Sequence, residues 1–180
     1  MLVADCSGVF EGLRRRDPQA MAQLYETFGR LVYSLIYRIV EDPGVAEDLV
    51  QETFLRLWNQ AHRFKPERGS PSAWVLTVAR NRAIDWKRSA AGKSWESYEL
   101  EDPAHFTDLE AELIQSDQAS RVRRAMEKLN DKQRGVIEMA YFEGLTQSEM
   151  AERTGQPLGT IKTWARAALQ TLRQELAGAS

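Results

Sequence analysis

Polar side chains suited to contacting a polyanion gather on one predicted helix near the end of the chain. Its outward positions carry Gly159, Thr160, Lys162, Thr163 and Arg166. Lys and Arg reach guanine edges or phosphates in the major groove of DNA, and Thr reaches either. The pattern also fits two packed helices with a solvated polar face, because short matches of this kind arise by chance in all-α chains. The residues alone leave both interpretations open.

The segment that positions these side chains has the anatomy of a helix-turn-helix. Residues 146–149, Thr-Gln-Ser-Glu, form a capping box that begins a short helix ending at about Thr154. A turn through residues 155–157 precedes a longer helix that extends to about Leu176. An earlier helix, capped by Asp131, is predicted to end at Gly144 as a left-handed C-cap. The apolar residues expected to pack against the preceding helices are Met150, Ala151, Leu158, Ile161 and Leu169.

The first half of the chain predicts three further helices. Asp17-Pro18 and Asp42-Pro43 each combine an N-cap residue with proline at the first helical position. Apolar residues at three- and four-residue spacing from Met21 to Ile39 indicate a long amphipathic helix. The next helix places Asp48, Gln51 and Glu52 on a polar face. A third helix runs from about Ser70 to Arg88, after a basic loop at residues 63–69 that contains Pro and Gly.

Charge is distributed unevenly along the chain, although the net charge is only −2. Residues 89–120 contain one base, Lys93, and eight acids, whereas the segments on both sides carry a small excess of Lys and Arg. We therefore expect an all-α protein with two small helical domains, residues 1–88 and 117–180. An acidic linker at residues 89–116 joins them. Two basic modules separated by an acidic tether are consistent with a polyanionic partner.

The composition argues against several classes of function. The single Cys6 cannot form an intramolecular disulfide, and His62 and His105 do not make a zinc set. We find no Gly-rich phosphate loop or catalytic constellation and expect no cofactor, metal or enzymatic activity. No apolar run is long enough to span a bilayer, and the first residues lack an export signal, which predicts a cytoplasmic protein.

Two segments resemble those of one known family. AEDLVQETFLRLW, at residues 46–58, followed by FKPERGSPSAWVLTVARNRAIDWKR, at residues 64–88, resembles region two of extracytoplasmic-function (ECF) sigma factors. Residues 129–173 resemble region four of the same family. The two segments stand in the family's order. The resemblance implies binding to core RNA polymerase, at the β′ clamp helices and the β flap, and to promoter DNA.

The resemblance also assigns roles to residues. On the first domain, it implies polymerase docking through the helix that carries Asp48, Gln51, Glu52 and Phe54. It implies that the loop at residues 63–69 cradles a flipped base of the minus-ten element, with Phe64 as a stacking face and Lys65 and Arg68 at phosphates. The residues implied in minus-ten binding are Arg63, Phe64, Lys65, Arg68, Arg80, Asn81, Lys87 and Arg88. Trp74 is expected to pack in the core.

The second domain is implied to read the minus-thirty-five element. The residues assigned to this contact are Thr160, Lys162, Thr163, Trp164 and Arg166. Trp164 departs from the family, which commonly has a basic residue at this position. Its indole either packs on the DNA backbone or faces inward. Family members of this minimal type are commonly held inactive by an anti-sigma factor, and we expect such a partner here.

Two other classes of protein remain as rivals. A stand-alone helix-turn-helix regulator explains residues 131–176 equally well, but it leaves the acidic helix and basic loop of the first domain unexplained. A helical enzyme or a pure adaptor protein is the second rival. The enzyme lacks a catalytic constellation, and the adaptor requires the basic surfaces to be incidental.

Overall fold

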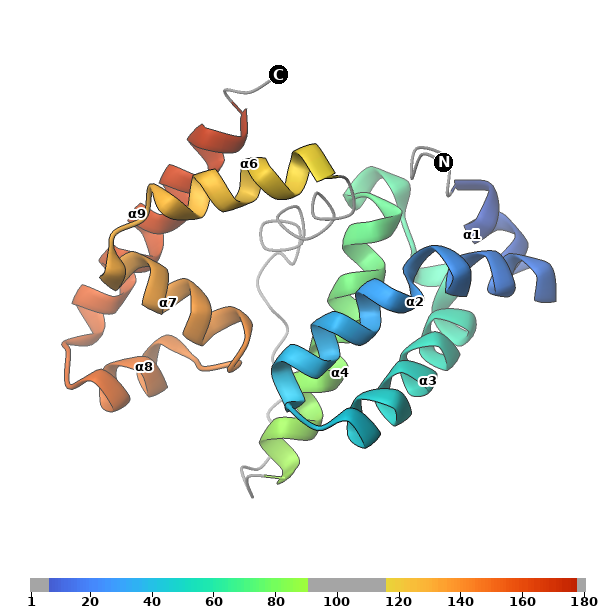
Figure 1. The fold of residues 1–180 in the computed structure, drawn as a ribbon, viewed down its shortest axis with the longest axis horizontal. Helices are drawn as coiled ribbons and strands as arrows, with labels where there is room; N and C mark the ends of the chain where they lie inside the picture. Colours follow the sequence, from blue (N-terminus) through green and yellow to red (C-terminus); the bar gives the residue numbers. More distant parts are fainter. Residues whose placement is uncertain (1–6, 91–115, 178–180) are drawn as a thin grey trace. The chain divides into compact units, whose positions relative to one another are not determined.

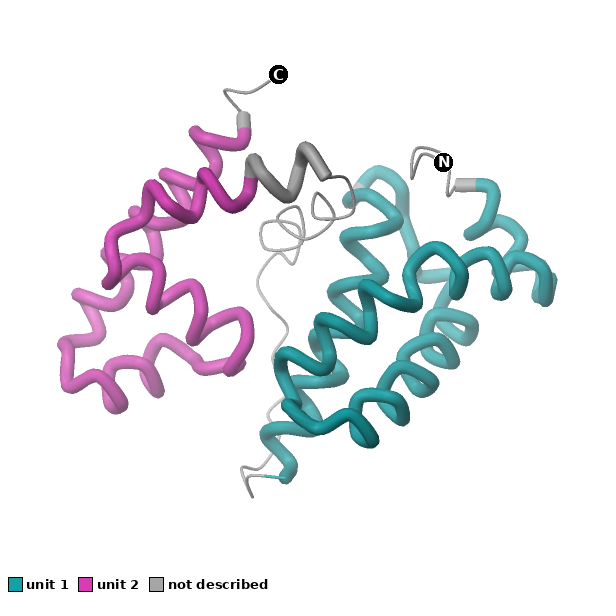
Figure 2. Tube along the Cα trace, viewed as in Figure 1, with its two compact units in different colours: residues 1–114 teal, residues 115–180 magenta. Residues whose placement is uncertain are grey.

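The computed structural model describes residues 7–90 and 116–177. Within these ranges the chain is built from α-helices and short 3-10 turns (Figure 1). It divides into two compact units, residues 1–114 and residues 115–180 (Figure 2). The expected all-α fold with two helical domains is confirmed. Cys6 lies outside the described residues, as does the predicted acidic linker at residues 89–116 except at its two ends.

Unit 1 contains four α-helices and two 3-10 turns. The turns η2 and η3 form the connection between the third and fourth helices. The elements are α1 (Ser7–Arg14), α2 (Pro18–Val40), α3 (Pro43–Gln60), η2 (Ala61–Arg63), η3 (Pro66–Arg68) and α4 (Pro71–Ala90).

The beginnings of α2 and α3 follow from their caps. The Asp17 carboxylate accepts a hydrogen bond from the Gln19 amide at 2.9 Å, and the Asp42 carboxylate accepts one from the Val45 amide at 2.9 Å. Each cap is followed by proline, whose fixed φ suits the first helical turn. Both predicted helix starts are therefore confirmed.

The core of unit 1 lies along the apolar face of α2. Leu24, Phe28, Val32, Ile36 and Ile39 are buried at the spacing that one face of a helix requires. Helices α3 and α4 both pack against α2 and against each other. They contribute the buried residues Leu49, Val50, Leu57, Val75, Leu76, Ala79 and Ala83.

Helix α1 was not predicted from the sequence, and it adds two residues to this core. Phe10 and Leu13 are almost fully buried. The helix lies against α2 at very short range, because a Cβ atom at Gly12 would come within 2.6 Å of the Ala20 Cβ. Glycine is therefore required at position 12 for the two helices to approach this closely.

Unit 2 is a separate four-helix arrangement with its own core. Its helices are α6 (Ser116–Glu127), α7 (Asp131–Tyr141), α8 (Gln147–Thr154) and α9 (Leu158–Ala177). Val136, Met150 and Ile161 form the buried centre, where α7, α8 and α9 meet. The capping box is present as predicted, because Thr146 Oγ1 accepts from the Glu149 amide and the Glu149 carboxylate accepts from the Thr146 amide.

Three local predictions in unit 2 were wrong. The N-cap of α7 is Asn130 rather than Asp131, because the Asn130 side chain completes a capping box with Gln133. Helix α7 ends at Tyr141, and Gly144 (φ 66°) lies beyond it in the turn to α8. Leu158 was expected to pack inward but is 38% exposed, because it is the first residue of α9 and no earlier turn of this helix covers it.

Candidate nucleic-acid and protein interfaces

Helix α3 presents a polar face to solvent. Asp48, Gln51 and Glu52 are exposed, and their spacing of three and four residues places them on the same side of the helix. Leu55 continues this face one turn further on and is 62% exposed. Phe54, which the resemblance also assigned to polymerase docking, does not share this face. It is buried, with its ring centroid 4.8 Å from that of Tyr25, because position 54 turns toward α2.

Ion pairs connect this face to α4. The Arg82 guanidinium donates to the Glu52 carboxylate at 2.5 Å, and Arg56 lies 4.0 Å from the carboxylate of Asp85. Burial raises the pKa of Asp85, although the positive charges of Arg56, Arg82 and Arg80 partly oppose this effect. These contacts hold α3 and α4 in register beside the exposed acids.

The loop between α3 and α4 exposes its basic side chains and buries its aromatic one. Arg63 and Lys65 are exposed. Phe64 is only 3% exposed, and its ring packs 4.4 Å from Phe10 and 5.8 Å from Trp74. The prediction of a stacking surface at Phe64 is therefore wrong for this structure, because α1 covers the ring. The expected packing of Trp74 is confirmed, since its indole contacts both phenylalanines.

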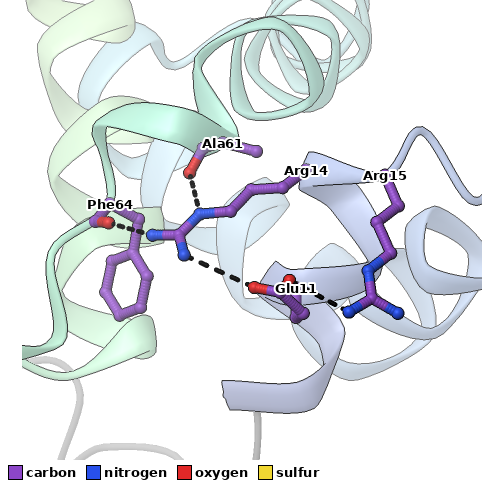
Figure 3. A network of polar contacts seen from close by, with 5 residues as sticks. All are labelled: Glu11, Arg14, Arg15, Ala61 and Phe64. Atoms are coloured by element: carbon purple, nitrogen blue, oxygen red, sulfur yellow. Dashed lines mark hydrogen bonds and ion pairs between the residues drawn. The ribbon is translucent and has the colours of Figure 1, made fainter.

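Arg14 at the end of α1 holds the backbone of this loop (Figure 3). Its guanidinium donates to the Phe64 carbonyl at 2.6 Å and to the Ala61 carbonyl at 3.4 Å. Sequence reasoning missed both α1 and this contact. The available signals were the pair Phe10 and Leu13, three residues apart, and the following run of three arginines at residues 14–16.

The four predicted DNA-facing residues of α4 are less exposed than expected. Arg80 is 7% exposed and donates to the Asn81 side-chain oxygen at 3.3 Å. Lys87 donates from Nζ to the carbonyl of Ile39 at 3.0 Å, where α2 ends. The prediction that Arg80 and Lys87 face outward is wrong, because α4 turns this side toward the rest of the unit. Asn81 and Arg88 are half-buried.

Helix α9 presents the predicted polar face. Lys162, Thr163 and Arg166 are exposed and Thr160 is half-buried. Lys162 and Arg166 are four residues apart, so their cationic groups lie on the same side of the helix. Thr163 donates its hydroxyl to the Gly159 carbonyl at 2.9 Å. Two cations and a hydroxyl on one side of the second helix suit a DNA groove.

Trp164 faces inward, which is one of the two arrangements left open by the sequence. Its indole packs against the cluster of Val136, Met150 and Ile161. Lys132 on α7 lies over the ring at 5.1 Å from the centroid. The predicted contact of Trp164 with DNA is therefore not supported, because the ring is used to join α9 to α7.

Residues 7–90 and 116–177 contain no group of three or more His, Cys, Asp or Glu side chains placed to hold a metal ion. No helix in these ranges has the length and apolar character that a membrane span requires.

Comparison with known proteins identifies the family. The family description "Sigma-70 region 2" matches residues 24–93, and "Sigma-70, region 4" matches residues 125–174. The ECF RNA polymerase sigma factor SigK of Mycolicibacterium vanbaalenii is 32% identical over 180 residues, covering 97% of this chain and 90% of the relative. The chain belongs to the ECF sigma factors of the sigma-70 family.

One further relative and one solved structure are also similar to this chain. SigK of Mycobacterium tuberculosis (strain ATCC 25177 / H37Ra) is 36% identical over 175 residues, covering 96% of this chain and 94% of the relative. The crystal structure of Rhodobacter sphaeroides SigE in complex with the anti-sigma ChrR has a TM-score of 0.53 and 33% identity. The similarity covers 97% of this chain and 99% of the SigE chain.

Membership in the sigma-70 family defines the general function. Its members are transcription initiation factors that bind core RNA polymerase and promoter DNA, and these are the partners of this chain. The stand-alone regulator is excluded, because it does not account for a region 2 match at residues 24–93. The region 2 match includes α3, the basic loop and α4, whereas α1 lies before it. The region 4 match includes α7 and α8 and ends within α9.

Proposed function

We propose that the two units of this sigma factor divide promoter recognition between them. Unit 1 docks on core polymerase and captures the melted minus-ten strand, and unit 2 reads the minus-thirty-five duplex. The observation that carries this proposal is the combination of exposed groups in one chain. A region 2 unit exposes an acidic and amide face on α3, and a region 4 unit exposes two cations and a hydroxyl on α9.

The docking surface is the face of α3 formed by Asp48, Gln51, Glu52 and Leu55. Its acids suit the basic side chains of a partner helix, such as those of the β′ clamp, and complementary charge raises the rate and specificity of docking. Leu55 supplies an apolar centre, because a large exposed side chain gains most from being covered by a partner. Phe54 supports the face from beneath rather than touching the partner. Unit 2 adds a second contact at the β flap.

Capture of the minus-ten strand is assigned to the loop and the adjacent part of α4. Arg63 and Lys65 are exposed cations suited to phosphates, and Asn81 is the side chain best suited to a base edge. Arg68 stays assigned to phosphates from the family resemblance alone, because its side chain lies outside the described ones. Holding a base out of the stack requires binding energy greater than the unstacking cost of about a few kcal/mol. No nucleotide hydrolysis is needed, so the chain acts by binding and catalyses no reaction.

Regulation by an anti-sigma factor follows from the same family membership. The structure of Rhodobacter sphaeroides SigE contains the anti-sigma ChrR, and that chain is similar to this one along nearly its full length. We extend this kind of partner to the present sigma factor. The chain then works in the cytoplasm, where core polymerase transcribes, and release from the partner switches it on.

Reconstituted transcription tests the proposal. The purified chain is mixed with bacterial core polymerase and a random promoter library, and the run-off products are sequenced. We expect co-purification with core and transcripts that share one minus-ten and one minus-thirty-five element. Co-purification without promoter-dependent transcripts refutes the proposed division of promoter recognition, and failure of the chain to bind core refutes the docking surface.

A further inference from the structure

Helix α1 makes contacts that neither its length nor the family match explains. It lies before the region 2 match at residues 24–93, yet it is packed tightly into unit 1. Its buried residues Phe10 and Leu13 face the core, and its last turn brings Arg14 to the α3–α4 connection. This eight-residue helix therefore combines apolar packing with a charged contact to a loop residue 50 positions further along the chain.

Arg14 donates to two backbone carbonyl groups in the connection that follows α3, and one of them, that of Ala61, also accepts from the Phe64 amide at 3.3 Å. Ala61 is the C-cap residue of α3 and the first residue of η2, and Phe64 follows directly after η2. The planar guanidinium reaches both carbonyls from different nitrogens, Nε and Nη2. Glu11 lies 3.5 Å from the third nitrogen, Nη1, and so fixes the guanidinium from its own helix (Figure 3). The contact is therefore built from both sides.

Phe10 holds the side chain of the same loop residue. Its ring lies 4.4 Å from Phe64 and 5.5 Å from Trp74, so the three rings join α1, the loop and α4. Thus Phe64 is held at two points by α1, its carbonyl by Arg14 and its ring by Phe10.

Holding Phe64 inward determines where its neighbours point. Phe64 and Lys65 have extended backbone (φ −64°, ψ 126° and φ −125°, ψ 109°). Successive side chains of an extended segment point to opposite sides. Because Phe64 is buried, Lys65 is directed outward, and it is exposed. Arg63, the last residue of η2, is exposed as well.

Arg16 contacts the last turn of α3, directly before this connection. Its guanidinium lies 5.5 Å from the centroid of the Trp58 ring and donates to the Asn59 side-chain oxygen at 3.2 Å. Arg16 has a left-handed backbone (φ 62°), which is uncommon for a residue other than glycine. The turn between α1 and α2 is thus fixed onto the last turn of α3.

We propose that α1 is a clasp that holds the Arg63–Gly69 loop in the shape that receives single-stranded DNA, with Arg14 as a positioning residue. This inference rests on the proposed function, since the strand is the ligand of the loop. Arg14 acts through the loop backbone and does not itself need to touch DNA. Its contribution is that the loop cations are already arranged before the strand arrives, so less ordering occurs on binding.

Three variants test the clasp in the full chain bound to core polymerase. Arg14→Ala removes both hydrogen bonds to the loop. Arg14→Lys keeps the charge, but its single ammonium lacks the planar fork that reaches two carbonyls at once. Arg15→Ala is the matched control, because it removes the same charge from the residue next to Arg14, in the turn after α1. The Arg15 side chain is 75% exposed and pairs only with Glu11 among the contacts of the described residues.

The probe is a fork-junction fragment of a promoter selected by the wild-type holoenzyme, with the non-template minus-ten strand unpaired. We expect Arg14→Ala to weaken capture of this fragment about tenfold, since it removes two charge-assisted hydrogen bonds from the loop. Arg14→Lys should lie between Arg14→Ala and wild type. Arg15→Ala should stay within about twofold of wild type, as expected for an exposed ion pair. Affinity for core and for a duplex minus-thirty-five fragment should stay unchanged in all three.

Hydrogen exchange separates positioning from general destabilisation. In Arg14→Ala we expect faster exchange of the amides at residues 63–69, with those in the middle of α2 protected as in wild type. Unchanged capture in Arg14→Ala overturns the clasp, as does an equal loss in Arg15→Ala. Faster exchange throughout α2 also overturns it, because Arg14 would then support the whole unit. A wild-type chain that drives no transcription refutes the proposed function instead.

Discussion

Arg82 on α4 donates to the carboxylate of Glu52 on α3, so one acid of the proposed docking face is already paired within the protein. Asp48, one turn earlier, shares the same exposed face. Reversing the charge at Glu52 alone would remove an internal ion pair and place two cations together. The effects on docking and on folding must therefore be separated in any test of this face.

A charge swap makes that separation. We expect Asp48→Lys to weaken binding to core polymerase about tenfold, as reversal of one charge in an interface commonly does. The double variant Glu52→Arg with Arg82→Glu should weaken it similarly while keeping an ion pair between the helices. Binding to core is measured by fluorescence titration, and Glu127→Lys on α6 is the control for net charge. Wild-type affinity in both variants would show that polymerase docks elsewhere.

The exposed cations of α9, Lys162 and Arg166, should each contribute to binding of duplex DNA. We expect Lys162→Ala or Arg166→Ala to weaken binding of a minus-thirty-five duplex, with a loss of about 1–3 kcal/mol where the side chain reads a base edge. For a cation at a phosphate, the slope of log affinity against log salt should fall by about 1. Titration at several salt concentrations gives both quantities, and core binding should not change.

Arg123→Ala is the matched control for these two variants. Arg123 is an exposed arginine on α6, in the same unit but outside the helix-turn-helix. Its removal should leave duplex affinity and the salt slope as in wild type. An equal loss from Arg123 would indicate that the unit attracts DNA only through its net charge.

The short distance between α1 and α2 predicts opposite effects for two glycines of one helix. Gly12→Ala should lower the free energy of unfolding by about 1–3 kcal/mol, because its Cβ would meet the Ala20 Cβ at 2.6 Å. Gly8→Ala meets nothing within 4 Å and should leave stability unchanged or raise it by up to about 1 kcal/mol. Urea unfolding of the two variants measures the difference. Equal stability would contradict the close packing of α1.

Asp85 gives a pH dependence whose sign follows from its raised pKa. The folded protein holds this proton more tightly than the unfolded chain does. The resulting stabilisation is full below the ordinary pKa of an aspartate and is lost as the pH rises through the raised value. Asp85→Asn should remove this part of the pH dependence, and Glu26→Gln, at an exposed acid of α2, should not. Urea unfolding at a series of acidic pH values is the measurement.

The sequence predicted those elements whose causes are local. The starts of α2 and α3 depend on Asp17 and Asp42 with the prolines that follow them, and the start of α8 depends on the pair Thr146 and Glu149. Each signal lies within four residues of the helix it begins. Helix α1 was missed because eight residues give only about two turns of apolar spacing, which is too little to establish a period.

Side-chain placement depended on contacts that are distant in the chain. Phe64 is buried because Phe10 covers it, and Lys87 turns toward α2 because the Ile39 carbonyl accepts its hydrogen bond. Phe54 could have been placed from its spacing, since it lies four residues after Val50 and three before Leu57, both of which are buried. The sequence spacing predicted which residues of each helix or loop belong to the candidate site. Tertiary packing then determined which of those side chains reach solvent.

The inward packing of Trp164 separates the residues that hold unit 2 together from the exposed residues beside it on α9. The indole and Lys132 anchor α9 to α7, so the neighbouring exposed positions 162, 163 and 166 are not needed to hold the unit together. Under the proposed function, substitutions at these positions are expected to change which promoter unit 2 binds while leaving its fold intact. One helical scaffold can then carry different promoter preferences.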